Sequence, residues 1–306
     1  MSASSRFLAP DLTQLTPAAL IEAISAESIL AAQKAWLSAR WEEVRVDRPD
    51  LPLLDTLGLE TEPLTILLET FAYRETLLRA LVNDKARAVL IAYAVGSDLD
   101  HLGALFGVVR TEIAPATPTK PVVMESDDRF RRRIQLAPEA FSTVGPRGAY
   151  MFFALTLDPS IVDAWAFTPR DGHVHVVVAG SGGQDVADAV IARLVARFER
   201  EDTVPLTDVV TVRRAEVVRY AVVLSVSFPR GPDPVLIRTR VENAIQAYAA
   251  ERYRIGAEVY TSGLIAAAKV GGVERVTLAV PAQDIVCADA EIPYLSDLQV
   301  TTLVLD

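Results

Sequence analysis

The stretch that decides the fold spans residues 127–150 and reads DDRFRRRIQLAPEAFSTVGPRGAY. Its two leading aspartates favour the start of a helix, because acidic side chains stabilise the positive end of the helix dipole. The STVGP run at 142–146 ends that helix, and Gly148 admits a new one. The chain before this stretch has the apolar periodicity of helices, whereas the chain after it alternates strand and helix patterns. The sequence therefore predicts an α+β protein whose helical part comes first.

Three adjacent arginines, Arg131, Arg132 and Arg133, follow the aspartates and are compatible with a nucleic-acid site. Arg131 lies four residues after Asp127, and Arg132 lies four residues after Asp128, so each arginine can pair with an acid along one helix. The formal net charge of the chain is -10, which disfavours non-specific attraction to phosphate. We therefore interpret the arginines as a solvated helix face, and a nucleic-acid binder is the alternative.

The composition is that of a globular chain without a membrane span. Of its 306 residues, 51% are hydrophobic, and the length suggests about two domains. The single cysteine, Cys287, excludes an intrachain disulfide and fits a reducing compartment. The first five residues lack the basic and apolar segments of a signal peptide. The longest apolar run, 88–95, is far shorter than the roughly 20 residues that cross a bilayer.

The first third of the chain predicts helices. After an arm at 1–16, the pair Thr16-Pro17 is suited to start a helix that runs to about Val44. Trp36 and Trp41 lie in this helix, and we expect them to be core residues rather than anchors for a partner. A further helix is expected to end near Val95, before a short one that begins around residues 96–98.

A second amphipathic helix is predicted from Pro63, a favoured first helical position, to about Val82. Its large apolar side chains recur at helical steps and fit either the core of their own domain or a surface that a partner helix covers. The residues at these steps are Leu64, Leu67, Leu68, Phe71, Leu78 and Leu81.

Three prolines, Pro115, Pro118 and Pro121, are spaced for a polyproline II helix. This segment fits a ligand of a proline-reading domain, but we expect a stiff linker. The predicted organisation is a helical assembly domain, a proline-rich linker and two α+β modules, at residues 1–114, 115–125, 126–215 and 216–306 respectively.

The second half predicts two small α/β-sandwich-like modules with mixed or antiparallel sheets. In the first, strands at 161–167 and 173–179 form a hairpin, and a helix opens at Asp185 before a strand at 209–212. The clearest strand of the second has apolar residues at every other position. The elements expected there are strands at 217–228, 273–280 and 298–305 and helices after Asp233 and at 262–270.

The loop Gly180–Asp185 is the best candidate for an active site, because a glycine-rich loop between strand and helix can hold a phosphate. Asp185 takes the place of the third glycine, and no Lys-Ser or Lys-Thr pair follows. His173 and His175 share a strand face, but a metal site normally needs a third ligand. We expect a flexible turn and polar surface residues, with no catalytic, cofactor-binding or metal-binding residue. An α/β enzyme with a nucleotide or phosphate site at this loop is the alternative.

Several segments resemble, in order, the baseplate protein J family, the wedge proteins of contractile-tailed bacteriophages and tailocins. They are residues 96–103, 127–150, 158–164 and 172–176, and the resemblance runs from about Leu51 to the C-terminus. In the central segment it rests on Asp127, Phe130, Arg131, Arg133, Gly145, Pro146, Gly148 and Tyr150.

The resemblance implies a structural protein of the virion, located in the tail baseplate and assembled in the cytoplasm of the host bacterium. In that family, a second copy of the chain and a baseplate protein I-like partner form a wedge. Wedges close into a six-fold ring around the hub and spike, beside a lysozyme-like wedge protein and near the sheath, and transmit the trigger for contraction. The N-terminal helices would bundle with these partners, while the modules would contact neighbouring copies. No nucleic acid and no membrane insertion are implied.

Overall fold

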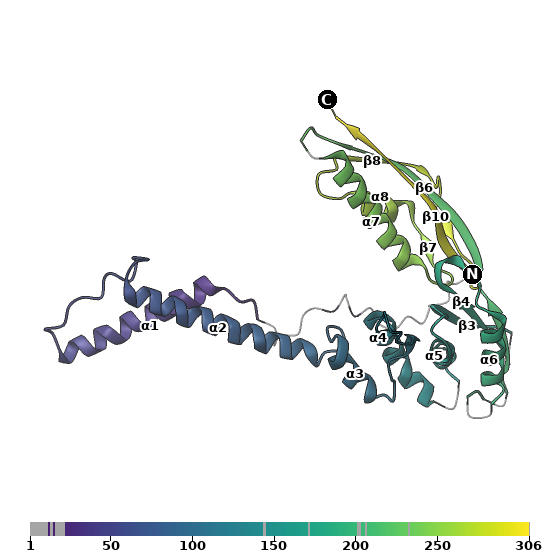
Figure 1. Ribbon diagram of the computed structural model, residues 1–306, viewed down its shortest axis with the longest axis horizontal. Coiled ribbons are helices and arrows are strands. Elements are labelled where there is room, and N and C mark those ends of the chain that lie inside the picture. Colours follow the sequence, from purple (N-terminus) through teal and green to yellow (C-terminus); the bar gives the residue numbers. More distant parts are fainter. Residues whose placement is uncertain are drawn as a thin grey trace. The chain divides into compact units, whose positions relative to one another are not determined.

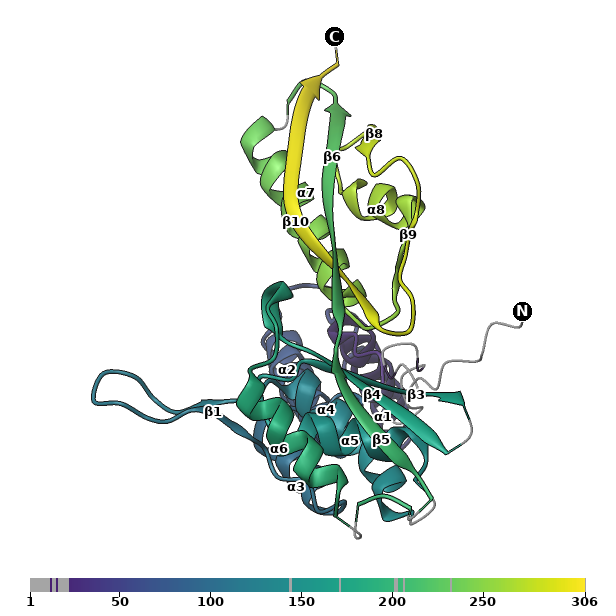
Figure 2. The same cartoon turned by 90° about the vertical axis from the view of Figure 1, so that its right-hand side faces the viewer.

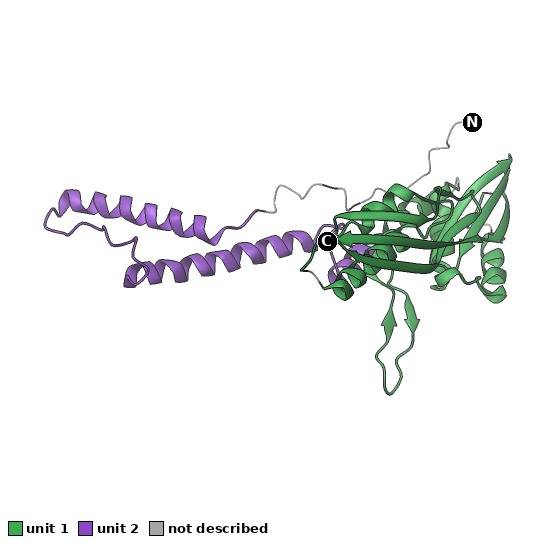
Figure 3. Ribbon diagram, turned by 90° about the horizontal axis from the view of Figure 1, so that it is seen from above, with its two compact units in different colours: residues 1–9, 106–306 green, residues 10–105 purple. Residues whose placement is uncertain are grey.

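The computed structural model describes Leu12, Leu15 and residues 22–142, 145–170, 172–200, 203–205, 207–231 and 233–305. The chain divides into two compact units, residues 10–105 and residues 1–9 with 106–306 (Figure 3). The predicted Thr16-Pro17 helix start lies outside the described residues. Among the described residues, no helix combines the length and apolarity needed to cross a membrane.

The unit of residues 10–105 is helical in its described part, with α1 (Ala26–Asp47), α2 (Pro63–Ala88) and α3 (Gly96–Ala104) (Figure 1). Ser25 caps α1, since its hydroxyl accepts a hydrogen bond from the backbone N–H of Ser28 at 3.2 Å. Residues 22–25 are not helical, so the prediction of one helix running on from Pro17 is wrong.

Helix α2 begins at Pro63 as predicted and continues to Ala88 without a break. Residues 89–93 then form turns, so the predicted helix ending near Val95 is wrong. Gly96, with φ +53°, opens α3 in a conformation that favours glycine.

A hairpin of two short antiparallel strands, β1 (Glu112–Ala114) and β2 (Val123–Met124), follows in the other unit. Figure 2 shows its loop extending away from the helices and sheets of that unit. Thr117 and Lys120 exchange backbone hydrogen bonds across the loop. The polyproline II conformation predicted for 115–121 is therefore wrong, because the chain folds back and bonds to itself. The domain boundary predicted there stays a prediction.

Helix α4 (Asp127–Leu136) starts after Ser126, whose hydroxyl accepts from the backbone N–H of Arg129 at 3.3 Å. A 3-10 turn, η2 (Ala137–Phe141), continues the chain, and α5 (Arg147–Leu157) begins after Pro146. The predicted break between two helices in this stretch is thus confirmed.

The first sheet contains β3 (Asp163–Arg170), β4 (His173–Ala179) and β5 (Val209–Arg214) in that order. Strands β3 and β4 form the predicted antiparallel hairpin, whereas β5 runs parallel to β4. Helices α5 and α6 (Asp188–Phe198) cover one face (Figure 2). Helix α6 begins three residues later than predicted, because Ser181–Gly183 forms a 3-10 turn first.

The second sheet has the order β10 (Glu291–Val304), β6 (Glu216–Phe228) and β8 (Arg275–Val280). Strand β6 pairs parallel with β10 and antiparallel with β8, and α7 (Pro234–Arg252) and α8 (Thr261–Ala268) lie on one face (Figures 1 and 2). A two-stranded sheet of β7 (Glu258–Val259) and β9 (Ile285–Val286) completes the module.

A single residue separates the two sheets along the chain. Ala215 follows β5 and donates its N–H to Val178 O at 2.9 Å, while Glu216, the first residue of β6, donates to Ala290 O at 2.8 Å. The core of the first module also includes Ile255 and Ile292 from the second. The predicted class, a helical part followed by two α+β modules with mixed sheets, is confirmed.

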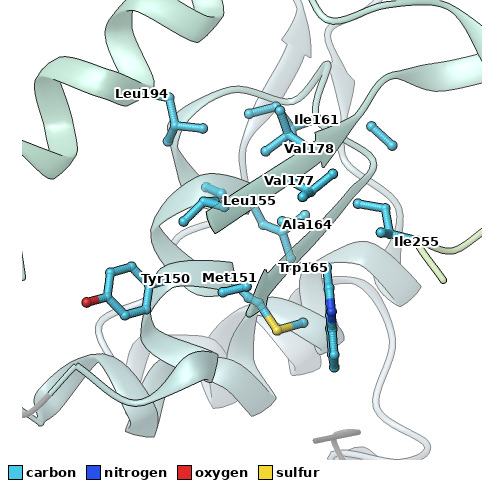
Figure 4. Close-up of a cluster of buried hydrophobic side chains, with 14 of the residues drawn as sticks. Tyr150, Met151, Leu155, Ile161, Ala164, Trp165, Val177, Val178, Leu194 and Ile255 are labelled. Atoms are coloured by element: carbon cyan, nitrogen blue, oxygen red, sulfur yellow. The ribbon is translucent and has the colours of Figure 1, made fainter. Parts of the chain in front are cut away.

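The core of the first module lies between α5 and its sheet (Figure 4). Met151 and Leu155 of α5 are buried beside Ala164 of β3 and Val178 of β4. Burial of each large apolar side chain contributes about 1.5–3 kcal/mol, so this layer fixes α5 on the sheet.

Candidate functional site

Helix α4 buries its arginines rather than presenting them to solvent. The exposed side-chain fraction is 15% for Arg131, 26% for Arg132 and 3% for Arg133. The interpretation of these residues as a solvated helix face is therefore wrong. A nucleic-acid site on α4 also loses its basis, because the guanidinium groups are occupied by other parts of the protein.

Arg133 lies at the centre of a buried ionic network. Its guanidinium pairs with the Glu125 carboxylate, which is fully buried. It also donates to Thr111 Oγ1 at 2.9 Å and to the backbone oxygen of Val109 at 3.2 Å, and its Nε donates to Thr156 Oγ1 at 3.3 Å. Buried charges are stable only when paired and hydrogen-bonded, and here both conditions are met.

Arg129 joins the same network to the end of α5. It pairs with Glu125 at 3.0 Å and donates to the backbone oxygens of Leu155 at 2.7 Å, Asp158 at 3.2 Å and Ile161. These acceptors include a carbonyl of the last turn of α5, where a cation is favourable. Burial lowers the pKa of Arg129, and the charge of Glu125 opposes that shift. The arginine thus acts as a C-terminal cap supplied by another helix.

Arg132 of α4 pairs with a residue outside its own helix, which the sequence did not predict. Arg132 pairs with Asp163 of β3, and the second oxygen of Asp163 accepts from the backbone N–H of Ile255 at 2.7 Å. Asp128 pairs with Arg131 at 2.8 Å, one position closer than the predicted partner Arg132. The prediction of an Asp128–Arg132 pair is therefore wrong, because Asp163 is the partner of Arg132.

Asp127 also has a partner outside its helix, since Arg110 lies 2.7 Å from it. The Arg110 guanidinium stacks over the Phe130 ring at 4.7 Å and donates to Glu125 O at 2.8 Å. Sequence reasoning missed Arg110, Glu125 and Asp163. Only Glu125 left a local signal, because it lies just before the start of α4 and four residues before Arg129.

The other predicted signature residues shape the turn between α4 and α5. Phe130 is fully buried, and Gly145 has φ +69° with Pro205 so close that a side chain would collide. A side chain at Gly148 would collide with Glu139. Tyr150 donates to Asp208 at 2.5 Å, and burial together with Asp208 raises the pKa of its hydroxyl. These residues therefore maintain the packing around the turn between α4 and α5.

Helix α2 shows the opposite behaviour, because it leaves large apolar side chains in solvent. The exposed fraction is 47% for Leu67, 52% for Phe71, 62% for Leu78 and 52% for Leu81. With Arg74, these residues follow the alternating four- and three-residue steps of a helix that packs on another helix. We call Leu67, Phe71, Leu78 and Leu81 the α2 seam.

The two other predicted interface residues lie elsewhere on α2. Leu68 is buried, and Leu64 is half-buried. Leu68 shares its side of the helix with Glu75 and Asn83. Glu75 accepts a hydrogen bond from the Gln33 side chain of α1 at 3.0 Å. Asn83 donates to the backbone oxygen of Glu22 at 2.9 Å and accepts from its backbone N–H at 3.1 Å. This side of α2 is therefore used within the unit, and the seam faces away from it.

The two tryptophans of α1 also differ. Trp41 is half-buried and donates to Pro52 O at 3.0 Å, whereas Trp36 is 70% exposed. The expectation of a core role is wrong for Trp36. A tryptophan exposed to this degree adds to the apolar surface of the helical unit.

The Gly180–Asp185 loop is occupied by tyrosines of the second module. Tyr253 accepts from the backbone N–H of Gly183 at 3.0 Å and donates to Gly180 O at 2.6 Å. The Tyr294 ring lies against Gly183, which has φ +69°. The N–H that a phosphate would require is therefore engaged, and the glycines are explained by this close packing.

The histidines form no metal site with other described residues. His173 and His175 lie on β4 as predicted, and the described part of the chain has no group of three or more metal-ligating side chains. Burial lowers the pKa of His175, with smaller contributions from Arg213, His173 and Arg170. The His175 ring packs edge-on against Phe167, with centroids 5.3 Å apart.

Comparison with known families accounts for most of this architecture. The family model described as "Baseplate J-like N-terminal domain" matches residues 60–117, and "Baseplate J-like central domain" matches residues 142–214. "Baseplate J-like protein C-terminal domain" matches residues 220–301. The three matches fall on the α2–β1 region, the first module and the second module.

A curated relative extends over almost the whole chain. "Baseplate protein J" of Escherichia phage P2 is 36% identical over 297 residues, covering 95% of this chain and 97% of the phage protein. A cryo-EM structure of the anti-feeding prophage (AFP) baseplate, 6-fold symmetrised, contains a chain with a TM-score of 0.38 and 13% identity, covering 60% of this chain and 47% of that one.

The chain therefore belongs to the baseplate protein J family, as its sequence motifs predicted. As a member of that family it is a structural component of a phage-tail baseplate. Its family membership favours a structural role over an enzymatic one.

Proposed function

We propose that this protein is a wedge component of a contractile-tail baseplate and that the α2 seam is its assembly surface. The partners are a baseplate protein I-like protein and a second copy of the chain. The wedges close into a six-fold ring around the hub and spike, near a lysozyme-like wedge protein and the sheath, and assemble in the host cytoplasm.

The observation that carries this proposal is the exposure of the seam. Monomeric proteins rarely expose contiguous rows of large apolar side chains, and such rows mark surfaces that another molecule covers. Ile66, Leu77 and Val82 flank the seam and are 51%, 52% and 51% exposed. Full burial of an exposed side chain of this size contributes about 1.5–3 kcal/mol, so each half-exposed seam residue that a partner covers contributes roughly half of that.

The buried network of α4 supports a mechanical role for the rest of the molecule. Through Arg132 and Asp163, α4 is joined to β3 and to the backbone of Ile255 in the second module. If one module is reoriented, these bonds would therefore move the other module together with it. We propose that this coupling transmits the trigger for sheath contraction.

The test is the double substitution Leu67→Glu with Phe71→Glu. Because both side chains are exposed, the isolated protein is expected to keep its fold by circular dichroism. It is also expected to lose co-purification with the protein I-like partner. Glu69→Ala, an exposed position of the same helix that lies off the seam, is the matched control. Normal baseplate assembly by the glutamate variant would refute the proposal.

A further inference from the structure

The first sheet has a covered face and a partly open one. Helices α5 and α6 cover the face that carries Val174, Val176 and Val178. Residues paired across strands share a face, so Phe167, His175 and Thr211 lie together on the other. Exposure is highest at the end of that face near the β3–β4 turn, where Val209 is 55% exposed. We call Phe167, Arg170, His173, His175, Val209 and Arg213 the open sheet face.

This open sheet face gathers positively charged side chains that lack a paired acid in the described part of the chain. Arg170 and Arg213 are exposed, His173 is half-buried, and none of the three has an ion-pair partner among the described residues. His175 adds a buried ring nitrogen, Nδ1, that has no hydrogen-bond partner there. A cationic surface of this kind is unusual on a chain whose formal net charge is -10. It favours an acidic partner over a neutral one.

The helical unit carries a surface of complementary chemistry. The end of α1 and the segment that leads to α2 carry three exposed apolar side chains, Val46 at 82%, Leu53 at 63% and Leu59 at 57%. Three exposed acids, Asp47, Asp55 and Glu60, alternate with them and have no ion-pair partner in the described part of the chain. We call these six residues the hairpin tip.

We propose that the hairpin tip of one copy docks on the open sheet face of a second copy. The acids of the tip would meet Arg170, His173 and Arg213, and its apolar side chains would cover Phe167 and Val209. The proposal rests on the proposed function, in which copies of the chain assemble, and it adds a contact distinct from the α2 seam.

Each copy carries both surfaces, the tip in the unit of residues 10–105 and the open sheet face in the other unit. A contact between two different surfaces of identical chains is heterologous, and such contacts generate a ring when the rotation closes. A second copy is therefore the occupant that fits both the complementary charges and the proposed ring.

The test uses charge reversal with rescue in the full-length protein. The face variant carries Arg170→Glu and Arg213→Glu, and the tip variant carries Asp55→Arg and Glu60→Arg. Either variant is expected to weaken self-association at low salt by about tenfold or more, because like charges then meet. The combination of all four substitutions in one chain is expected to restore it. Analytical ultracentrifugation measures each dissociation constant.

The matched control is Arg238→Glu with Arg240→Glu, which makes the same charge change at exposed positions of α7. It is expected to leave self-association unchanged. Circular dichroism checks each fold, and Arg170→Gln with Arg213→Gln replaces any face variant that fails to fold. Association that is insensitive to both variants, or is not rescued by their combination, would overturn the proposal.

Two further outcomes would also overturn it. One is salt-sensitive DNA binding that disappears in the face variant, which would assign the face to nucleic acid. The other is a cross-link between tip and face within a single chain. Co-purification of the protein I-like partner depends on the seam, so the docking and the proposed function can fail separately.

Discussion

Helices α4 and α2 place their side chains in opposite ways. Helix α4 carries four arginines, yet Arg133 is only 3% exposed and its partner Glu125 is fully buried. Helix α2 presents Phe71 at 52% and Leu78 at 62% exposure. The difference shows that burial follows the available partners rather than polarity. The charges of α4 find theirs within the same unit, and the apolar seam of α2 is left for another molecule.

Truncation of the chain is expected to give the largest effect on the buried ionic network around α4. A chain of residues 106–306 keeps Arg110 and Thr111, which bond Asp127, Glu125 and Arg133. It is expected to melt cooperatively without the helical unit. A chain of residues 122–306 lacks those partners, and we expect it to be less stable by about 5 kcal/mol, because Glu125 and Arg133 lose several hydrogen bonds that contribute about 1.5–3 kcal/mol each when a charged group takes part. Denaturant unfolding compares the two, and equal stability would contradict the network.

A single substitution tests the same network without shortening the chain. Arg133→Ala leaves Glu125 buried and short of its main cation, so the free energy of unfolding is expected to fall by about 3–5 kcal/mol. Arg40→Ala is the control, because Arg40 and its partner Glu43 are both exposed, and it is expected to cost less than about 1 kcal/mol. Similar losses in both variants would show that burial of the α4 charges has no energetic weight.

Adjacent leucines on α2 separate its two sides. Leu68 is 9% exposed and Leu67 is 47% exposed. Leu68→Ala is expected to destabilise the helical unit by about 2–3 kcal/mol through a lost core contact. Leu67→Ala is expected to cost less than about 0.5 kcal/mol in the isolated protein. Thermal unfolding of the two variants measures the contrast, and a reversed order would mean that the seam faces inward.

The smallest expected effect concerns Tyr150, which packs beside the α4 region. Burial and Asp208 raise the pKa of its hydroxyl, so the folded protein holds this proton more tightly than the unfolded chain. The resulting stability is present below the ordinary tyrosine pKa of about 10 and declines as the pH rises above it. Tyr150→Phe is expected to cost about 1 kcal/mol at neutral pH and to remove that part of the alkaline decline.

Much of the fold could be predicted because its elements carry local signals. Pro63 predicted the start of α2, and Asp233 predicted the start of α7. The apolar residues at every other position predicted β6. Strand β10 was recognised only in its second half, since a register shift between Leu295 and Asp297 breaks its pattern. Local periodicity cannot show such an irregularity in advance.

The candidate sites were harder to predict, because their side chains depend on distant segments. The partners of Arg132 and Arg133 lie up to 31 residues away along the chain, so only the fold brings them together. The amphipathic pattern of α2 predicted a surface, but it did not separate Leu68 from Leu67. A helix with apolar residues on two sides gives no sequence signal for which side meets its own chain.

Amide hydrogen exchange of the free and the assembled protein tests the central claim most directly. We expect amide exchange in residues 67–82 of α2 to slow on assembly, because the seam becomes covered, while exchange in α4 stays the same. Unchanged exchange across α2 in assembled baseplates, or a change confined to α4, would contradict it.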